Sequence, residues 1–207
     1  MSYYANNSCK QEQKMQYFGR LFVLGALFLT ISACTPTVAK PRWVFEKQAV
    51  KIHVKASNDL NMYNGRPHTL YICTYQLTNF NTFDRLARDP DGIHRLLECR
   101  LFDQSVASTN SKVIHAGEHV TLILDRAEQA QHLAVVAGYS AGLTSERVVR
   151  RHTFQTGKHL IRMLQQEYRC IPCELNIELS LGPHQIEYSN IIPNEPVCHD
   201  ECEQTTY

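Results

Sequence analysis

The sequence predicts a mainly β domain, a two-sheet β-sandwich with one or two helical insertions. Apolar and polar residues alternate over 50–56 and again over 174–181, the period-two pattern of strands that bury one face. Two other short runs, 70–77 and 133–139, are apolar almost throughout, which indicates strands buried on both faces. Several short strands separated by turns favour a sandwich over an alternating α/β fold.

The elements follow from the pattern in order along the chain. Val50–Ala56 is the first predicted strand and Leu70–Leu77 the second. Within 83–101 the leucines have helical spacing, but Asp89-Pro90-Asp91-Gly92 interrupts it, so one turn of helix, a break and a helix from about Gly92 are expected. The remaining elements are predicted as strands over 119–124, 133–139 and 147–154 (an edge strand), a helix over 157–168, and strands over 174–181 and 185–188.

The composition limits the classes of function. The chain has 207 residues, 43% of them hydrophobic, and a net charge of +1 with both signs spread along the sequence. No basic stripe suggests a nucleic-acid partner, and no nucleophile elbow, phosphate-binding loop or dinucleotide motif is present. We therefore expect a protein that is not an enzyme, with no metal and no cofactor.

The N-terminus has the pattern of a lipoprotein signal peptide. Arg20 precedes an apolar run of about 13 residues, which is too short to span a bilayer. The run ends in Ile31-Ser32-Ala33-Cys34, a lipobox whose cysteine receives the lipid (palmitate among its acyl chains). The prediction is a signal peptide over 1–33, with Met15 a candidate for the true start, and Cys34 on the periplasmic face of the outer membrane.

Three further segments follow the signal peptide. Residues 34–42 are a lipidated tether, residues 43–192 the β-sandwich domain, and residues 193–207 a cysteine-containing tail. In the oxidising periplasm the remaining cysteines are expected to form disulfides. The favoured pairing is Cys73 with Cys99, and the others then pair among themselves. The disulfide candidates are Cys73, Cys99, Cys170, Cys173, Cys198 and Cys202.

Two cysteine patterns have other interpretations. Cys170-Ile171-Pro172-Cys173 has the form of a thiol–disulfide oxidoreductase motif, but that chemistry needs a helix after the motif, and a strand is predicted there. The same two cysteines with Cys198 and Cys202 would also suit a zinc ion. Disulfides remain the first interpretation. His115 and His119 lie four apart, but Gly117 between them indicates a turn rather than a metal-binding helix.

The connection between the first two strands is unusually long. Residues 59–68 combine turn formers with Leu60, Met62 and Tyr63, whereas a hairpin needs only two to five residues. Either the loop reaches out to a partner, or Leu60 and Met62 fold back and only close the core. On the first interpretation the partner-binding residues are Asn61, Met62, Tyr63, Asn64, Gly65 and Arg66.

Over 50–139 the sequence resembles the TssJ family of type VI secretion lipoproteins. The matching features are the lipobox, Asn61, Gly65-Arg66-Pro67, Tyr75-Gln76-Leu77, Phe83, Gly117-Glu118 and Val135-Val136-Ala137. Ala116 departs from the family's usual proline, and Gly138-Tyr139-Ser140 stands where an aromatic–arginine pair is common. These departures keep open a related lipoprotein of a type IVB (Dot/Icm-like) core complex.

The resemblance implies a transthyretin-like sandwich that the lipid anchors to the outer membrane. The implied partner is the periplasmic C-terminal region of the inner-membrane IcmF-like protein TssM, within a multi-copy membrane complex. It also implies that the loop between the first two strands contributes to that contact. The competing interpretation from the residues themselves is a periplasmic thiol–disulfide protein that uses Cys170 and Cys173.

Overall fold

The computed structural model describes residues 41–162 and 167–193. The chain divides into two compact units, Met1–Thr37 and Val38–Tyr207, and the described residues belong to the second. The predicted signal peptide, Cys34 and the tail beyond Pro193 lie outside the described residues. Within 41–162 and 167–193, no helix has the length and hydrophobicity of a membrane span.

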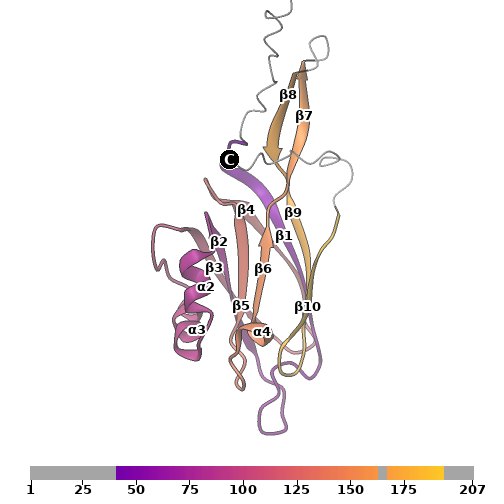
Figure 1. Ribbon diagram of the computed structural model, residues 1–207. Helices are drawn as coiled ribbons and strands as arrows, with labels where there is room; N and C mark the ends of the chain where they lie inside the picture. Colours follow the sequence, from indigo (N-terminus) through magenta and orange to yellow (C-terminus); the bar gives the residue numbers. More distant parts are fainter. Residues whose placement is uncertain (1–40, 163–166, 194–207) are drawn as a thin grey trace, which may run out of the picture. The chain divides into compact units, whose positions relative to one another are not determined.

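Two four-stranded sheets form the sandwich, and a separate hairpin adds two more strands (Figure 1). The sheet orders are β10-β9-β1-β4 and β3-β2-β5-β6, and β7 pairs with β8. The strands are β1 (Glu46–Ala56), β2 (Leu70–Leu77), β3 (Val106–Ile114), β4 (His119–Arg126), β5 (His132–Ala137), β6 (Val149–Thr153), β7 (Thr156–Arg162), β8 (Glu167–Pro172), β9 (Leu175–Leu181) and β10 (Ile186–Ile191). The helices are α2 (Asn81–Leu86), α3 (Pro90–Leu97) and α4 (Ser145–Val148).

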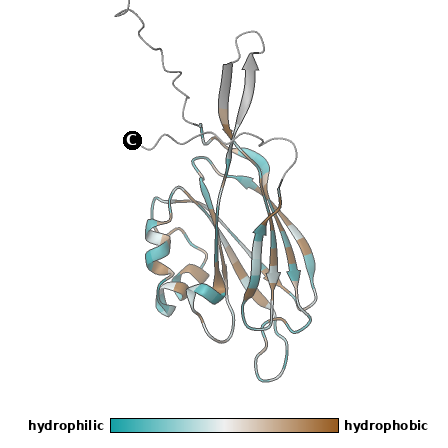
Figure 2. Cartoon of the chain, turned by 45° about the vertical axis from the view of Figure 1, so that its right-hand side comes forward, coloured by the Kyte–Doolittle hydropathy of each residue, from teal (hydrophilic) through white to brown (hydrophobic). Residues whose placement is uncertain are grey.

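The alternating pattern of β1 and β9 places their apolar residues in the core. Val50, Ile52 and Val54 of β1 are buried, and β9 lies beside them in parallel, with Ile177 opposite Ile52. The lysines of β1 point to the other face, where Lys55 Nζ lies 2.7 Å from Glu178 Oε2. Figure 2 shows this alternation as hydrophobic and hydrophilic bands along the strands. The period-two pattern therefore predicted both strands and their buried faces.

Helices α2 and α3 cover the outer face of the second sheet. Tyr75 of β2 packs edge-on against Phe83 of α2, and its hydroxyl donates to the Leu96 carbonyl of α3 at 2.6 Å. Burial raises the pKa of Tyr75 to about 12. The Cys73–Cys99 disulfide ties β2 to the end of this helical layer, which confirms the favoured pairing. The helices are thus fixed to the sandwich by packing and by a covalent bond.

The break predicted at 89–92 is the start of α3. Asp89 is the N-cap, and its carboxylate accepts from the Gly92 backbone N–H at 2.8 Å. Pro90 occupies the first turn, where a missing N–H costs nothing. Gly92 packs closely on α2, because a Cβ there would lie 1.9 Å from the Leu86 carbonyl oxygen.

Three elements differ from the prediction, one of them the short helix α4, which was not predicted. The helix predicted over 157–168 is wrong, because β7 and β8 form an antiparallel hairpin there, with Gly157 opposite Ile171. Strand β3 was not predicted, because its sequence VASTNSKVI lacks apolar alternation. It is an edge strand paired with β2 alone, so most of its side chains are at least partly exposed.

The two long sides of the sandwich differ. On one side β6 and β10 are joined across the sheets: His152 Nε2 lies 2.7 Å from Ser189 Oγ, and Arg150 donates to the Ile186 carbonyl. Nearby, the Tyr139 hydroxyl donates to the Gln185 carbonyl at 2.6 Å. On the other side β3 and β4 are the edge strands of their sheets. Edge strands of the two sheets are therefore hydrogen-bonded to each other along the β6–β10 side, and the β3–β4 side is called here the open side.

Candidate functional site

The loop between β1 and β2 is a narrow hairpin at one end of the sandwich (Figure 1). Tyr63 and Arg66 exchange both backbone hydrogen bonds, at 3.0 and 3.1 Å. Between them Asn64 and Gly65 have φ of 49° and 73°, which makes a type I′ turn. Further down, the His68 N–H donates to the Leu60 carbonyl at 3.0 Å. The long loop is therefore an ordered, hydrogen-bonded hairpin.

Neighbouring loops fasten the base of this hairpin. Leu60 is fully buried in the core. The Asn61 side-chain amide donates to the Thr69 carbonyl at 2.9 Å, and its oxygen accepts from the Ser140 N–H at 2.8 Å. The Met62 N–H donates to the Pro183 carbonyl at 2.8 Å. The loop is thereby bound to the β5–α4 connection and to the β9–β10 turn.

The structure divides the six predicted contact residues into two groups. Asn61 is only 4% exposed, so the prediction that its side chain meets a partner is corrected: Asn61 holds the loop in place. Met62 is half-buried, and Leu60 closes the core as the second interpretation expected. Tyr63, Asn64, Gly65 and Arg66 are exposed. The base of the loop therefore closes the core, and the tip is exposed, where the predicted partner contact stays a prediction.

The exposed part, residues 63–68, is called the tip. Tyr63 is 49% exposed, and the His68 ring stands edge-on to it with centroids 6.1 Å apart. His68 Nδ1 lies 2.9 Å from the Arg66 carbonyl oxygen. The sequence prediction did not include His68. The Asn64-Gly65 pair was the signal for the inner hairpin, because this dipeptide is typical of type I′ turns.

The turn between β3 and β4 lies against the start of the same loop. The Gly117 N–H donates to the Ser57 carbonyl at 3.0 Å, and Gly117 has a φ of 72°. His115 lies at the start of this turn, and its N–H donates to the Glu118 carboxylate at 2.8 Å. In the described part of the chain, no three His, Cys, Asp or Glu residues gather as metal ligands would.

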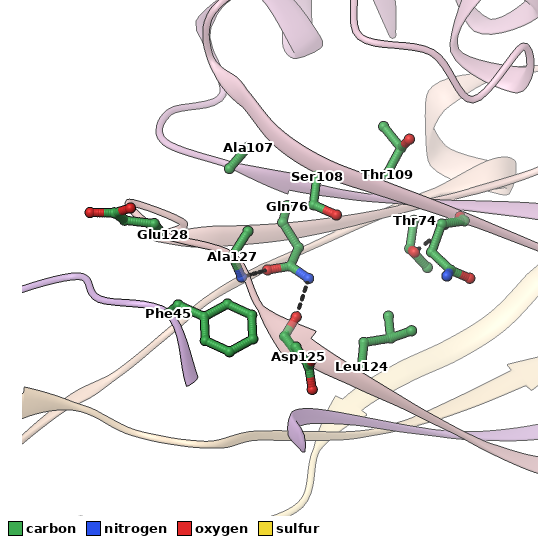
Figure 3. Close-up of a pocket in the computed structure, with 11 residues that line it drawn as sticks. Phe45, Thr74, Gln76, Ala107, Ser108, Thr109, Leu124, Asp125, Ala127 and Glu128 are labelled. Atoms are coloured by element: carbon green, nitrogen blue, oxygen red, sulfur yellow. Dashed lines mark hydrogen bonds between the residues drawn. The ribbon is translucent and has the colours of Figure 1, made fainter. Parts of the chain in front are cut away.

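A cavity of about 370 Å³ lies on the open side of the sandwich (Figure 3). Gln76 projects into it from β2 and bridges the sheets: its amide donates to the Asp125 carbonyl, and its oxygen accepts from the Ala127 N–H, both at 2.7 Å. Thr74 donates to the Asn110 carbonyl at 3.1 Å. Gln76 therefore joins the two sheets, whereas the Thr74 bond joins β2 to β3 within one sheet.

The first three residues of the Cys170–Cys173 motif end strand β8, and Cys173 lies in the short connection to β9. The motif is therefore part of a strand, where a preceding helix was predicted. Both cysteines are disulfide-bonded, and Cys198 and Cys202 lie outside the described residues. The described chain continues after the motif into β9, so the helix N-terminus that lowers the pKa of a catalytic thiol is missing at this place.

Comparisons with known proteins agree with this architecture. The family model described as "Type VI secretion lipoprotein, VasD, EvfM, TssJ, VC_A0113" matches residues 48–165. The lipoprotein TssJ1 of Pseudomonas aeruginosa has 16% sequence identity and a TM-score of 0.50, over 74% of this chain and 99% of that one. Lip of Serratia marcescens, a membrane-bound component of the type VI secretion system, has 14% identity and a TM-score of 0.51, over 70% of this chain and 97% of that one.

No sequence among the curated proteins matches the chain. The likeness to the two solved lipoproteins shows the fold, which is the β-sandwich of TssJ-like proteins. The family model covers more than half of the chain, from within β1 to beyond β7. The chain therefore belongs to the TssJ family of type VI secretion lipoproteins.

Proposed function

We propose that this protein is an outer-membrane lipoprotein, acylated on Cys34, that anchors a type VI membrane complex from the periplasmic side. Its partner is the periplasmic C-terminal region of the inner-membrane IcmF-like protein TssM. The protein acts as a docking module without enzymatic activity, in several copies per complex. Membership of the lipoprotein family supports this proposal, and so does the structure of the loop.

The tip carries the proposal. Tyrosine and arginine are frequent hot-spot residues of protein interfaces, and the tip offers Tyr63 and Arg66 side by side on an exposed turn. The type I′ turn and the fastened base hold these residues before any partner arrives. Little conformational entropy is then lost on binding, which favours affinity.

The tip follows the end of β1 that is farther along the chain from Cys34. The chain reaches the sandwich at Glu46, at the first residue of β1, and the tip follows the other end of that strand. The 11 residues of β1 correspond to about 35 Å at the usual strand rise. Cys34 lies 12 positions before Glu46, so the tether reaches at most about 40 Å. A tip at the far end is well placed to meet a protein that comes from the inner membrane.

Co-purification with the periplasmic region of TssM tests the contact. Tyr63→Ala combined with Arg66→Glu should weaken binding by about thirtyfold or more, the effect of losing one hot spot. Both side chains are exposed, so the melting temperature should stay unchanged. Tyr188→Ala is the matched control, since Tyr188 is 39% exposed on β10, away from the tip. Equal binding by wild type and the double variant would refute the proposed docking loop.

Cell fractionation tests the anchor separately. Cys34→Ser removes the thiol that receives the lipid, and the protein should move from the outer-membrane fraction to the soluble periplasm. The variant should still bind the TssM region in solution, because the tip is unchanged. A Cys34→Ser protein that remains in the outer-membrane fraction would contradict lipid anchoring through Cys34.

A further inference from the structure

The residues that lead into β1 form an exposed apolar surface. Arg42–Phe45, called here the lead-in segment, contains Val44 and Phe45, which are 53% and 54% exposed. Two adjacent large apolar side chains with more than half of their surface in water are costly unless something covers them. They directly precede β1, at the end of that strand opposite the β1–β2 loop.

The lead-in segment is fixed on the domain. Arg126, which is 1% exposed, donates to the Glu46 carboxylate at 2.7 Å and to the Val44 carbonyl at 3.4 Å. The Gln129 N–H donates to the Trp43 carbonyl at 2.7 Å. The Trp43 ring packs edge-on against Phe154, with centroids 6.5 Å apart. The exposure of Val44 and Phe45 is therefore a property of the folded domain and not of a loose end.

The short distance along the chain from Cys34 to this surface indicates what covers it. Val44 lies ten positions after Cys34, so it can be at most about 35 Å from the lipid. We propose that the lead-in segment rests on the phospholipid surface, with Val44 and Phe45 in the boundary between headgroups and acyl chains. This inference rests on the lipid anchor of the proposed function and adds a second, non-covalent membrane contact made by the domain.

The charges around the segment define the kind of lipid surface. Arg42 and Lys47 are exposed, and the exposed carboxylates of Asp125 and Glu128 offset them. Glu46 is paired with buried Arg126 and adds no net charge. Because the charges balance, attraction to anionic lipids contributes little, and burial of apolar surface drives the contact. Binding should be the same on zwitterionic vesicles with and without high salt.

Trp43 is the only tryptophan in the chain, so its fluorescence reports on this segment alone. The lipidated protein is reconstituted into phosphatidylethanolamine–phosphatidylcholine vesicles whose lipids are brominated close to the headgroup. Bromine should quench Trp43, and Val44→Ser with Phe45→Ser should remove most of the quenching. Ile123→Ser is the matched control, because Ile123 is 54% exposed on the outer face of β4. Absence of quenching, or quenching that the double variant retains, would overturn the proposal.

A second measurement does not depend on lipidation. Full-length mature protein with Cys34→Ser is sedimented with the same zwitterionic vesicles. Adding Val44→Ser and Phe45→Ser should lower the partition coefficient about tenfold, from the apolar surface that no longer enters the membrane. Equal partitioning, or binding that high salt abolishes, would refute the contact. If Cys34→Ser remains in the outer-membrane fraction, the lipid anchor is refuted. The sedimentation result still tests the contact of the lead-in segment, because that measurement does not use the lipid.

Discussion

Replacing Asn61 separates the two causes that hold the tip in place. Asn61 supplies two side-chain hydrogen bonds at the base of the loop, and it adopts a φ of 47°, which few side chains other than asparagine tolerate. Asn61→Ala loses both bonds and keeps the unfavourable backbone conformation. Asn61→Gly loses the same bonds but removes the backbone strain.

The expected magnitudes follow from these contacts. Each lost hydrogen bond lowers the free energy of unfolding by about 1 kcal/mol, because Thr69 and Ser140 are exposed and water can replace part of the bond. Alanine in the left-handed region adds about 1 kcal/mol. Asn61→Ala should therefore cost about 3 kcal/mol, which lowers the melting temperature by roughly 6–12 °C. Asn61→Gly should lower the free energy of unfolding by roughly 0.5–1 kcal/mol less than Asn61→Ala does. Glycine avoids the backbone strain, but its greater freedom in the unfolded state offsets part of this gain.

Equilibrium unfolding in urea, with the disulfides intact, measures both variants, and titration with the TssM region measures their binding. The affinity should fall in both, because the tip loses its fixed position although none of its exposed residues has changed. Two results would refute the reasoning. One is a loss below about 0.5 kcal/mol for Asn61→Ala, within the range of ordinary surface changes. The other is Asn61→Gly being the less stable of the two.

Two further predictions concern stability. Changing Cys73 and Cys99 together to alanine should lower the free energy of unfolding by about 3–4 kcal/mol, because the bond joins residues 26 positions apart; a change below about 1 kcal/mol in urea unfolding would contradict this. Burial, with a smaller contribution from Arg150, lowers the pKa of His152 from 6.5 in the folded state. As the pH falls, the unfolded state therefore binds the proton before the folded state does. The contribution of His152 to stability is fully present above pH 6.5 and is lost as the pH drops below it. Unfolding at pH 7 and at about pH 5.5 should show this loss, and His152→Gln should reduce it; an unchanged pH dependence in the variant would contradict the assignment.

The strands whose pattern reflects burial could be predicted from the residues alone. β1 and β9 alternate because one face of each lies in the core. β2 and β5 are apolar almost throughout because most of their residues are buried on both faces. The interruption at Asp89–Gly92 and the resemblance over 50–139 were also readable from the residues. In each case the physical cause is local, so a window of sequence contains it.

Pairing partners decided the elements that the sequence did not predict. The apolar residues of 157–168 have helical spacing, yet this segment pairs as a hairpin with residues up to Pro172. β3 forms because its backbone hydrogen-bonds to the edge of β2, and its polar side chains do not indicate this pairing. Such hydrogen bonds join backbone groups distant in sequence, and a local pattern does not record them.

The loop shows the same division within a few residues. The sequence indicated an unusually long connection with turn formers, and it placed Tyr63 and Arg66 among the contact residues. The tertiary structure decided that Asn61 is buried, because its amide meets Thr69 and Ser140, and the latter lies 79 positions away. Composition determines which side chains can bind a partner, whereas packing against distant loops determines which of them remain exposed to do so.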